Sequence, residues 1–277
     1  MRLSKARNPR KHPIDSRHRF STRIGVPHLF DCWSQIAREI RNARNIQLFL
    51  DFDGTLTVYC DRPGDLKISA KMRGLLARLS RRPDVHVTVV SGRRNAALRK
   101  YISVPGIQLM GLFGWETKGH KPLPRRTLKL VRDLRTMLAP LPTLYPGVTI
   151  EDKGVSYAVH FREASAEVGA ELRSWVEKLV ARLQPAIGLI RTHTAYDIVP
   201  RQVQGKGAAL REYLRTVPEP FLPIYIGDDL TDEPAFVVLQ NGITVRVGPA
   251  SRTHAHFRLK DPKEVYSFLE RFEDELL

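Results

Sequence analysis

The stretch Ile46–Leu56 (IQLFLDFDGTL) constrains the fold of this chain most, because it joins a strand-like run to two carboxylates. Its apolar first half, which ends at Leu50, is typical of a strand buried on both faces of a parallel sheet. Asp and Gly interrupt strands, so the strand should end at Asp51. Asp51 and Asp53 then follow the carboxyl end of a strand, where open α/β sheets bind their ligands.

This aspartate pair has a chemical interpretation. In extended chain, alternate residues point the same way, so Asp51 and Asp53 can face one pocket. One carboxylate can attack covalently while the other transfers a proton. Crowded acids repel unless a cation lies among them, and Mg²⁺ is the expected cation. The alternative is an ordinary strand-to-helix turn with solvated aspartates, which a bare Asp-x-Asp-Gly motif does not exclude.

A second apolar strand, Val85–Val90, ends in Ser91, Gly92 and Arg93. A hydroxyl, an unhindered backbone amide and a guanidinium can all bind phosphate oxygens. The alternative is a turn that caps a helix beginning near Arg94.

Lys206 follows Gly205 and opens an apolar helical stretch. A lysine in a first helical turn opposes the helix dipole, and pairing with an anion would offset this penalty. The alternative is an exposed lysine that follows a glycine turn.

A further strand, Pro223–Ile226, leads into Gly227-Asp228-Asp229 and then Thr231-Asp232-Glu233. Helix capping accounts for the second group, because acidic residues suit a helix N-terminus. It does not account for Asp228 and Asp229 side by side at a strand end, whereas a bound metal does.

The segment between Ser91 and Lys206 is longer than one strand and its helix need, since a βα unit takes about 30 residues. We therefore expect a small second domain of α+β type over residues 118–200. Its expected elements are a basic helix, a hairpin, a long helix and returning strands (128–138, 148–161, 164–183 and 188–199). Elsewhere, apolar spacing predicts helices over 30–43 and 69–81, a third core strand over 106–113 and a loop or small hairpin over 57–66.

Composition limits the class of protein. The chain has 277 residues, 42% hydrophobic and 27% charged, which suits one large or two modest globular domains. It has no run of about 18 apolar residues, so no membrane span is expected. The first residues lack an apolar signal sequence, and Cys32 and Cys60 form no metal or redox spacing. We expect a cytoplasmic protein.

The net charge of +16 is concentrated near the N-terminus. Residues 1–45 hold eleven Lys and Arg against three Asp and Glu, a net of +8. Residues 1–30 are expected to form a disordered basic arm. The arm can be a solvated tail, a non-specific contact for nucleic acid or anionic lipid, or an organelle-targeting segment.

Taken in order, the aspartate pair, the serine, the lysine and the acidic GDD-x-x-D resemble the four signature motifs of the haloacid dehalogenase superfamily of phosphotransferases. The resemblance covers the chain from about Asn45 to Leu277. All four motifs occur together, each correctly placed relative to a predicted strand or helix. It implies an α/β fold: a Rossmann-like core with a parallel sheet (31–117 and 201–277) and a small α+β cap domain (118–200).

The resemblance also implies roles for individual residues. Asp51 would be the nucleophile, and Asp53 the acid that protonates the leaving oxygen and then the base that activates water. Thr55, Ser91 and Lys206 would contact the phosphoryl oxygens. The implied Mg²⁺ ligands are Asp51, Asp53 through its backbone carbonyl, Asp228 and Asp232, the last either as a direct ligand or as a partner of one.

The residues of the expected cap hairpin limit the class of substrate. Glu151, Asp152, Lys153, His160 and Arg162 cluster there, where alternate residues face one way. Such mixed donors and acceptors suit a hydroxyl-rich sugar, although charged residues on a strand are often simply solvated. Glu-Asp-Lys-Gly with His-x-Arg and Gly-Asp-Asp-x-Thr-Asp-Glu resembles the trehalose-6-phosphate phosphatase branch. The expected substrate-binding residues are Gly92, Arg93, Glu116, Glu151, Lys153 and Arg162.

Two departures from that branch touch the expected sugar pocket. Gly111-Leu112-Phe113-Gly114 stands where the family often has Gly-Ser-His-Gly, and Asp197-Ile198-Val199-Pro200 where it tends to have Glu-x-Arg-Pro. Neither changes the catalytic set.

The expected function is a Mg²⁺-dependent phosphatase that converts trehalose 6-phosphate to trehalose and phosphate through an aspartyl-phosphate. One alternative is a phosphatase for another glycosyl phosphate, such as sucrose phosphate or mannosyl-phosphoglycerate. Another is a non-catalytic sugar-phosphate sensor, which would be expected to lack Asp51 or Asp53. Nucleic-acid binding beyond the basic arm is not expected, because the chain shows no recognition helix or stacking aromatic stripe. The sequence predicts no oligomeric state.

Overall fold

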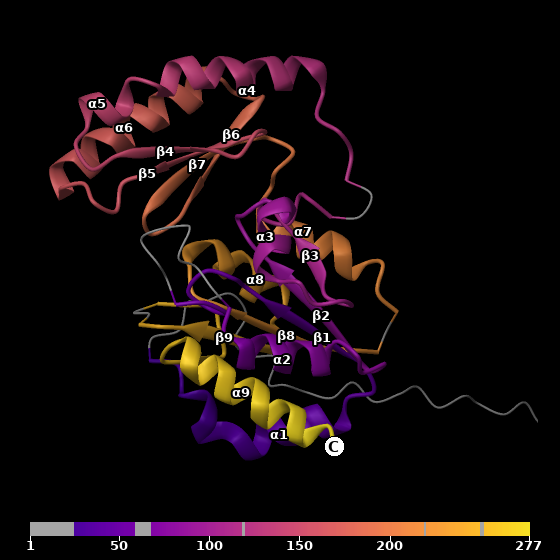
Figure 1. Cartoon of the computed structure of the whole chain (residues 1–277). Helices are drawn as coiled ribbons and strands as arrows, with labels where there is room; N and C mark the ends of the chain where they lie inside the picture. The colour runs from indigo at the N-terminus through magenta and orange to yellow at the C-terminus, as the bar shows by residue number, and fades with distance from the viewer. Residues whose placement is uncertain (1–24, 59–67, 118–119, 219, 250–251) are drawn as a thin grey trace, which may run out of the picture.

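The computed structural model describes residues 25–58, 68–117, 120–218, 220–249 and 252–277. These residues form two units, one above the other in Figure 1, each built on its own sheet. Most of the basic arm and of the loop expected over 57–66 lies outside the described residues. The chain passes from the lower unit to the upper one after β3 and returns after β7 (Figure 1).

The lower unit, here the core unit, contains a six-stranded parallel sheet in the order β10-β9-β8-β1-β2-β3. Its strands are β1 Ile46–Leu50, β2 Val85–Val90, β3 Gln108–Met110, β8 Leu222–Gly227, β9 Ile243–Val247 and β10 Phe257–Leu259. The expected α/β fold with a parallel sheet is confirmed. In β1, which lies between β8 and β2, all five residues are buried.

The complete burial of β1 follows from helices on both faces of the sheet. Leu48 and Leu50 pack in one apolar cluster, and Phe49 packs in another, as the alternation of a strand requires. The first cluster includes residues of α1, α2 and α9, and the second includes residues of α7 and α8. The helices and 3-10 turns of the core unit are η1 Leu29–Cys32, α1 Trp33–Asn42, α2 Ala70–Leu79, α3 Asn95–Tyr101, α7 Lys206–Leu214, η3 Leu230–Asp232, α8 Glu233–Val238 and α9 Pro262–Glu275.

The upper unit, here the cap unit, contains an antiparallel sheet in the order β4-β5-β7-β6. Its elements are α4 Arg125–Leu138, α5 Leu141–Leu144, β4 Thr149–Asp152, β5 Tyr157–His160, α6 Ala166–Arg182, β6 Ile187–Arg191 and β7 Ala195–Pro200. The helices cover the sheet face that is turned away from the core unit (Figure 1). This arrangement fits the expected α+β cap, and the exact boundaries at 118 and 200 stay a prediction.

Local sequence signals account for several element ends. The Ser69 hydroxyl accepts a hydrogen bond from the Met72 amide at 3.1 Å and so caps α2, as predicted. The third strand, β3, is shorter than the expected 106–113 at both ends, and the backbone turns sharply after Met110. Leu112 and Phe113 both adopt positive φ there, 46° and 57°.

No described helix is both long enough and apolar enough to cross a bilayer.

Candidate active site

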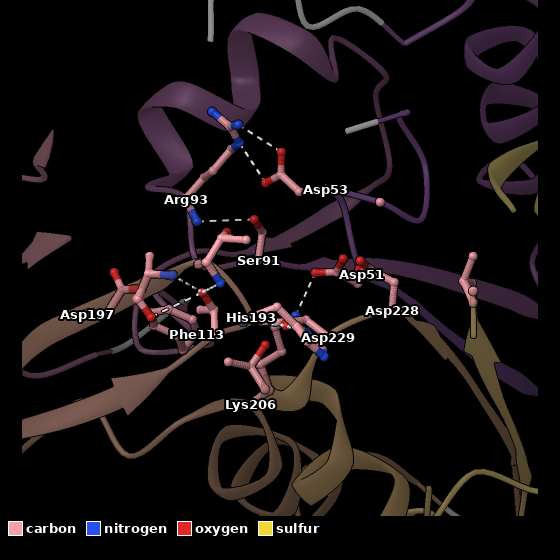
Figure 2. A pocket seen from close by; sticks show the side chains of 18 of the residues that line it. Asp51, Asp53, Ser91, Arg93, Phe113, His193, Asp197, Lys206, Asp228 and Asp229 are labelled. Atoms are coloured by element: carbon pink, nitrogen blue, oxygen red, sulfur yellow. Dashed lines mark hydrogen bonds and ion pairs between the residues drawn. The ribbon is translucent and has the colours of Figure 1, made fainter. Parts of the chain in front are cut away.

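The carboxyl ends of β1, β2 and β8 meet at a pocket of about 480 Å³ between the two units. The core unit contributes Asp51, Ser91 and Asp228 to its wall, and the cap unit contributes Glu151 and Lys153. Parallel strands bring their carboxyl ends to one edge, which is why segments far apart in the sequence converge here. Figure 2 shows this convergence.

Lys206 holds two of the acids together. Its Nζ donates to Asp51 Oδ1 at 2.6 Å and to Asp232 Oδ1 at 2.7 Å, and the residue is only 2% exposed. The Tyr225 hydroxyl donates to the same Asp232 oxygen at 2.6 Å. Lys206 therefore pairs with anions, as expected, and these anions are the carboxylates of Asp51 and Asp232.

The charges in this group shift each other's pKa. Burial alone would lower the pKa of Lys206, but the carboxylates of Asp232 and Asp51 outweigh it, so the pKa is raised. Burial raises the pKa of Asp51 well above its usual value; Lys206 opposes this rise, while Asp232 and Asp228 add to it. Burial, together with the nearby Asp232, raises the pKa of Asp228 to about 7. The site thus holds more acid than its lysine neutralises.

A hard cation would relieve this excess. Asp51, Asp228 and Asp232 each offer one carboxylate oxygen, and these oxygens lie within 4.8 Å of one another. Carboxylate oxygens are the ligands that Mg²⁺ prefers, so the donor set fits it. Gly54 permits the close approach, because a Cβ on its backbone, at φ 79°, would lie 2.2 Å from Asp228 Oδ2.

Asp53 lies in the pocket wall but points away from Asp51. Both of its oxygens accept hydrogen bonds from Arg93, from Nε at 2.7 Å and from Nη2 at 2.8 Å. Figure 2 shows Asp53 directed toward Arg93, whereas Asp51 lies beside Asp228. Both aspartates line one pocket, as expected. Their carboxylates have different partners, because Asp51 binds Lys206 and Asp53 binds Arg93. The Asp53 carboxylate is not part of the acid cluster.

The two predicted hydroxyls differ in how they are placed. Ser91 lies in the pocket wall, and its Oγ accepts from the Arg93 amide at 3.1 Å. Thr55 is completely buried, and its hydroxyl donates a long hydrogen bond to Asp228 Oδ1 at 3.5 Å. The geometry gives Ser91 access to a ligand and gives Thr55 a role in holding the acid cluster.

The cap unit contributes a buried ion pair above the core. Lys153 Nζ donates to Asp197 Oδ1 at 2.6 Å and to the Gly92 carbonyl at 3.3 Å, so it links the two units. Burial alone would lower the pKa of Lys153, but Asp197 and Glu151 outweigh it and the pKa is raised. Lys153 also lies 5.6 Å from the centre of the Phe113 ring. Thus two sequence departures, Asp197 and Phe113, touch the predicted sugar-binding lysine directly.

The other predicted cap residues, Glu151 and Arg162, also line the pocket. Glu151 accepts a hydrogen bond from His160 Nε2 at 3.0 Å. Glu116 does not line the pocket. Its carboxylate instead accepts hydrogen bonds from Arg94 Nε at 2.9 Å and from the Asn95 amide at 2.5 Å. In this structure Glu116 fixes the start of α3 instead of facing a substrate.

The contact that His193 makes between the units was not predicted from the sequence. His193, in the turn between β6 and β7, lines the pocket, and its backbone amide donates to Asp229 Oδ1 at 3.1 Å. The sequence has no signal for this contact, because a turn histidine carries no motif. Asp229 itself is not part of the acid cluster.

Comparison with known proteins identifies the family of this chain. The family model described as "Trehalose-phosphatase" matches residues 49–263. This chain belongs to the trehalose-phosphatase family. It is accordingly a phosphatase, and the predicted resemblance is confirmed.

Individual members of the trehalose-phosphatase family align along most of the chain. "Trehalose-6-phosphate phosphatase" of Escherichia coli K12 is 28% identical over 230 residues, 80% of this chain and 84% of that protein. "Probable trehalose-phosphate phosphatase C" of Arabidopsis thaliana is 28% identical over 265 residues, 88% of this chain and 82% of that protein. The C-terminal domain of the Candida albicans trehalose-6-phosphate phosphatase shares the fold, with a TM-score of 0.76 at 22% identity over 91% of this chain and 99% of that domain.

Proposed function

We propose that this chain hydrolyses trehalose 6-phosphate to trehalose and phosphate through an aspartyl-phosphate on Asp51, with Mg²⁺ as cofactor. The observation that carries the proposal is the placement of Asp51. Its carboxylate is buried at the end of β1, bonded to Lys206, next to Asp228 and under a polar cap unit. The trehalose-phosphate phosphatases to which this chain is similar support the substrate. The cytoplasmic location expected from the sequence stays a prediction.

The reaction has two steps. An Asp51 oxygen attacks phosphorus, the bond from phosphorus to the sugar oxygen breaks, and Asp53 gives its proton to that oxygen. Asp53, now ionised, takes a proton from water, which attacks the aspartyl-phosphate and releases phosphate. Ser91 and Lys206 would hold the phosphoryl oxygens, whose charge grows in the transition state. When bound by Asp51, Asp228, Asp232 and the Asp53 carbonyl, Mg²⁺ would screen the phosphate from the attacking carboxylate.

The cap unit supplies the sugar contacts in this proposal. Glu151, Lys153, Arg162 and Asp197 line the same pocket as Asp51, and they offer donors and acceptors suited to sugar hydroxyls. At this pocket the two units contact each other through Lys153 and Gly92 and through His193 and Asp229. In the proposal, closure of the cap unit over the substrate excludes water from the first step.

A substrate panel tests the proposed specificity. Phosphate release would be measured with Mg²⁺ from trehalose 6-phosphate, sucrose 6-phosphate, mannosyl-3-phosphoglycerate and glucose 6-phosphate. We expect kcat/KM for trehalose 6-phosphate to exceed the others by at least about 100-fold, because unpaired buried polar groups penalise a wrong sugar. A higher value for another sugar phosphate would contradict the substrate and leave the phosphatase chemistry intact. Tight binding without turnover would favour the sensor.

Metal removal should change stability in a pH-dependent way. The raised pKa of Asp228, about 7, means that the metal-free fold takes up a proton that the unfolded chain has released. Its stability therefore falls as pH rises from the usual carboxyl range toward 7. Mg²⁺ should raise the melting temperature by several degrees at pH 7.5 and little at pH 5.5, where protons compete for the ligands.

Differential scanning fluorimetry with EDTA or with Mg²⁺ at both pH values measures this effect. The matched variant is Asp228→Asn, which should abolish the increase at pH 7.5. Control variant Asp133→Asn, on the exposed side of α4, should keep it. An equal Mg²⁺ effect at the two pH values, or in Asp228→Asn, would contradict the assigned site.

A further inference from the structure

Arg93 is held in one place from several sides. Its guanidinium carbon lies 5.8 Å from the centre of the Phe52 ring and 5.8 Å from that of Tyr101. Its backbone amide donates to Ser91 Oγ at 3.1 Å. The side chain is 22% exposed, and Nε and Nη2 both bind Asp53. Such a two-point contact between guanidinium and carboxylate fixes orientation as well as distance.

This contact conflicts with proton donation. In the first step of the proposed reaction, Asp53 must present an O–H to the leaving sugar oxygen. Here both Asp53 oxygens act as acceptors for Arg93 and are directed toward it (Figure 2). Neither oxygen can give a proton to a substrate beside Asp51 in this arrangement. The Asp53–Arg93 contact must therefore loosen before the phosphorus–oxygen bond to the sugar breaks.

The cap unit holds a competing acid. Glu151 of β4 lines the same pocket as Arg93, and its side chain is 47% exposed. Burial alone would lower the pKa of Arg93, but Asp53 and then Glu151 outweigh it, so the pKa is raised. Two carboxylates, one from each unit, thus lie in the same pocket as this guanidinium. Among the described residues, none accepts a hydrogen bond from the third nitrogen of Arg93, Nη1.

We propose that Arg93 is a positioning residue, which holds Asp53 away from the leaving oxygen. When the cap unit closes over a bound sugar, Glu151 replaces Asp53 as the partner of the guanidinium. The inference rests on the proposed function and deepens it. Arg93 then contributes to specificity, because esters that do not engage the cap unit leave Asp53 withdrawn. Asp53 is released to donate its proton only when a sugar spans the pocket from Asp51 to the cap unit.

The test compares two small substrates that cannot engage the cap unit. Glycerol 2-phosphate needs protonation of its leaving alkoxide, whereas para-nitrophenyl phosphate has a leaving group that needs none. The ratio of their kcat/KM values measures how available Asp53 is as an acid, and a general loss of activity cancels in it. For Arg93→Gln we expect this ratio to rise about tenfold or more over wild type, within the range of general acid catalysis. Arg93→Lys should give a smaller rise.

Three variants make the test specific. Arg93→Gln combined with Asp53→Asn should show no rise, because the effect acts through Asp53. Arg94→Gln removes the neighbouring arginine, which binds Glu116 and does not line the pocket, and should keep the wild-type ratio. An unchanged or lower ratio in Arg93→Gln, or a rise that survives Asp53→Asn, would overturn the proposal.

The role of Glu151 is tested with the sugar phosphate preferred in the substrate panel. Glu151→Gln should lower the preference for that sugar phosphate over glycerol 2-phosphate by more in wild type than in Arg93→Gln, where only the loss of its sugar contact remains. Equal effects in both backgrounds would overturn the transfer to Glu151. Full activity of Asp51→Asn would instead contradict the proposed function itself, so the two failures are distinguishable.

Discussion

Asp51→Asn is expected to lower kcat for trehalose 6-phosphate by about 10⁴-fold or more, because an amide cannot form the aspartyl-phosphate. The substitution is nearly isosteric. It also removes a buried acid whose charged form is disfavoured, since burial raises the pKa of Asp51 well above its usual value. Lys206 keeps Asp232 as a partner. The melting temperature at pH 7.5 should therefore stay within a few degrees of wild type while turnover disappears.

Single-turnover phosphate release and acid-quench trapping of phosphorylated protein measure this effect. Wild type should accumulate an acid-stable, hydroxylamine-sensitive phosphoprotein, and Asp51→Asn should form none. Asp53→Asn serves as the matched control, because it removes the proton donor and keeps the nucleophile. With para-nitrophenyl phosphate, it should still form the phosphoprotein. Turnover by Asp51→Asn at more than about one hundredth of the wild-type rate would exclude Asp51 as the nucleophile.

The sequence predicted those parts of the site that are fixed by strand ends. Asp51, Ser91 and Asp228 each follow an apolar run, and the parallel register places these runs side by side. The turn residues around Gly154 predicted the hairpin of β4 and β5, in which Asp152 pairs with Tyr157. Local patterns determine which residues lie at an edge of a sheet, and the edge determines which residues meet.

The partner of each side chain could not be predicted in this way. Nothing in the sequence says that Asp53 turns toward Arg93, because alternation in an extended segment describes the backbone and not the rotamer. Nor does it say that Glu116 binds Arg94 and the start of α3, since an acid after a strand suits a pocket equally well. Lys153 and Asp197 are 44 residues apart in the sequence, and the pairing of the cap strands brings them together.

Lys206→Met is expected to cost about 3–5 kcal/mol of stability, because it leaves buried acids without their counter-charge. Lys206 Nζ bonds Asp51 at 2.6 Å and Asp232 at 2.7 Å, and Asp232 is fully buried. Methionine is similar in length to lysine, so the loss of stability would come from the missing charge and not from a cavity. Activity should fall as well, since the phosphoryl group loses a fixed cation.

The pH dependence separates this electrostatic cause from simple misfolding. The pKa of Asp228 is raised to about 7, so this acid carries less charge at pH 5 than at pH 7.5. The melting temperature of Lys206→Met should therefore lie further below wild type at pH 7.5 than at pH 5, and Mg²⁺ should recover part of the difference at pH 7.5. Lys129→Met, on the exposed side of α4, should match wild type at both pH values. A deficit that is equal at both pH values and insensitive to Mg²⁺ would mean that Lys206 acts through packing, and that the acids around it are neutral without it.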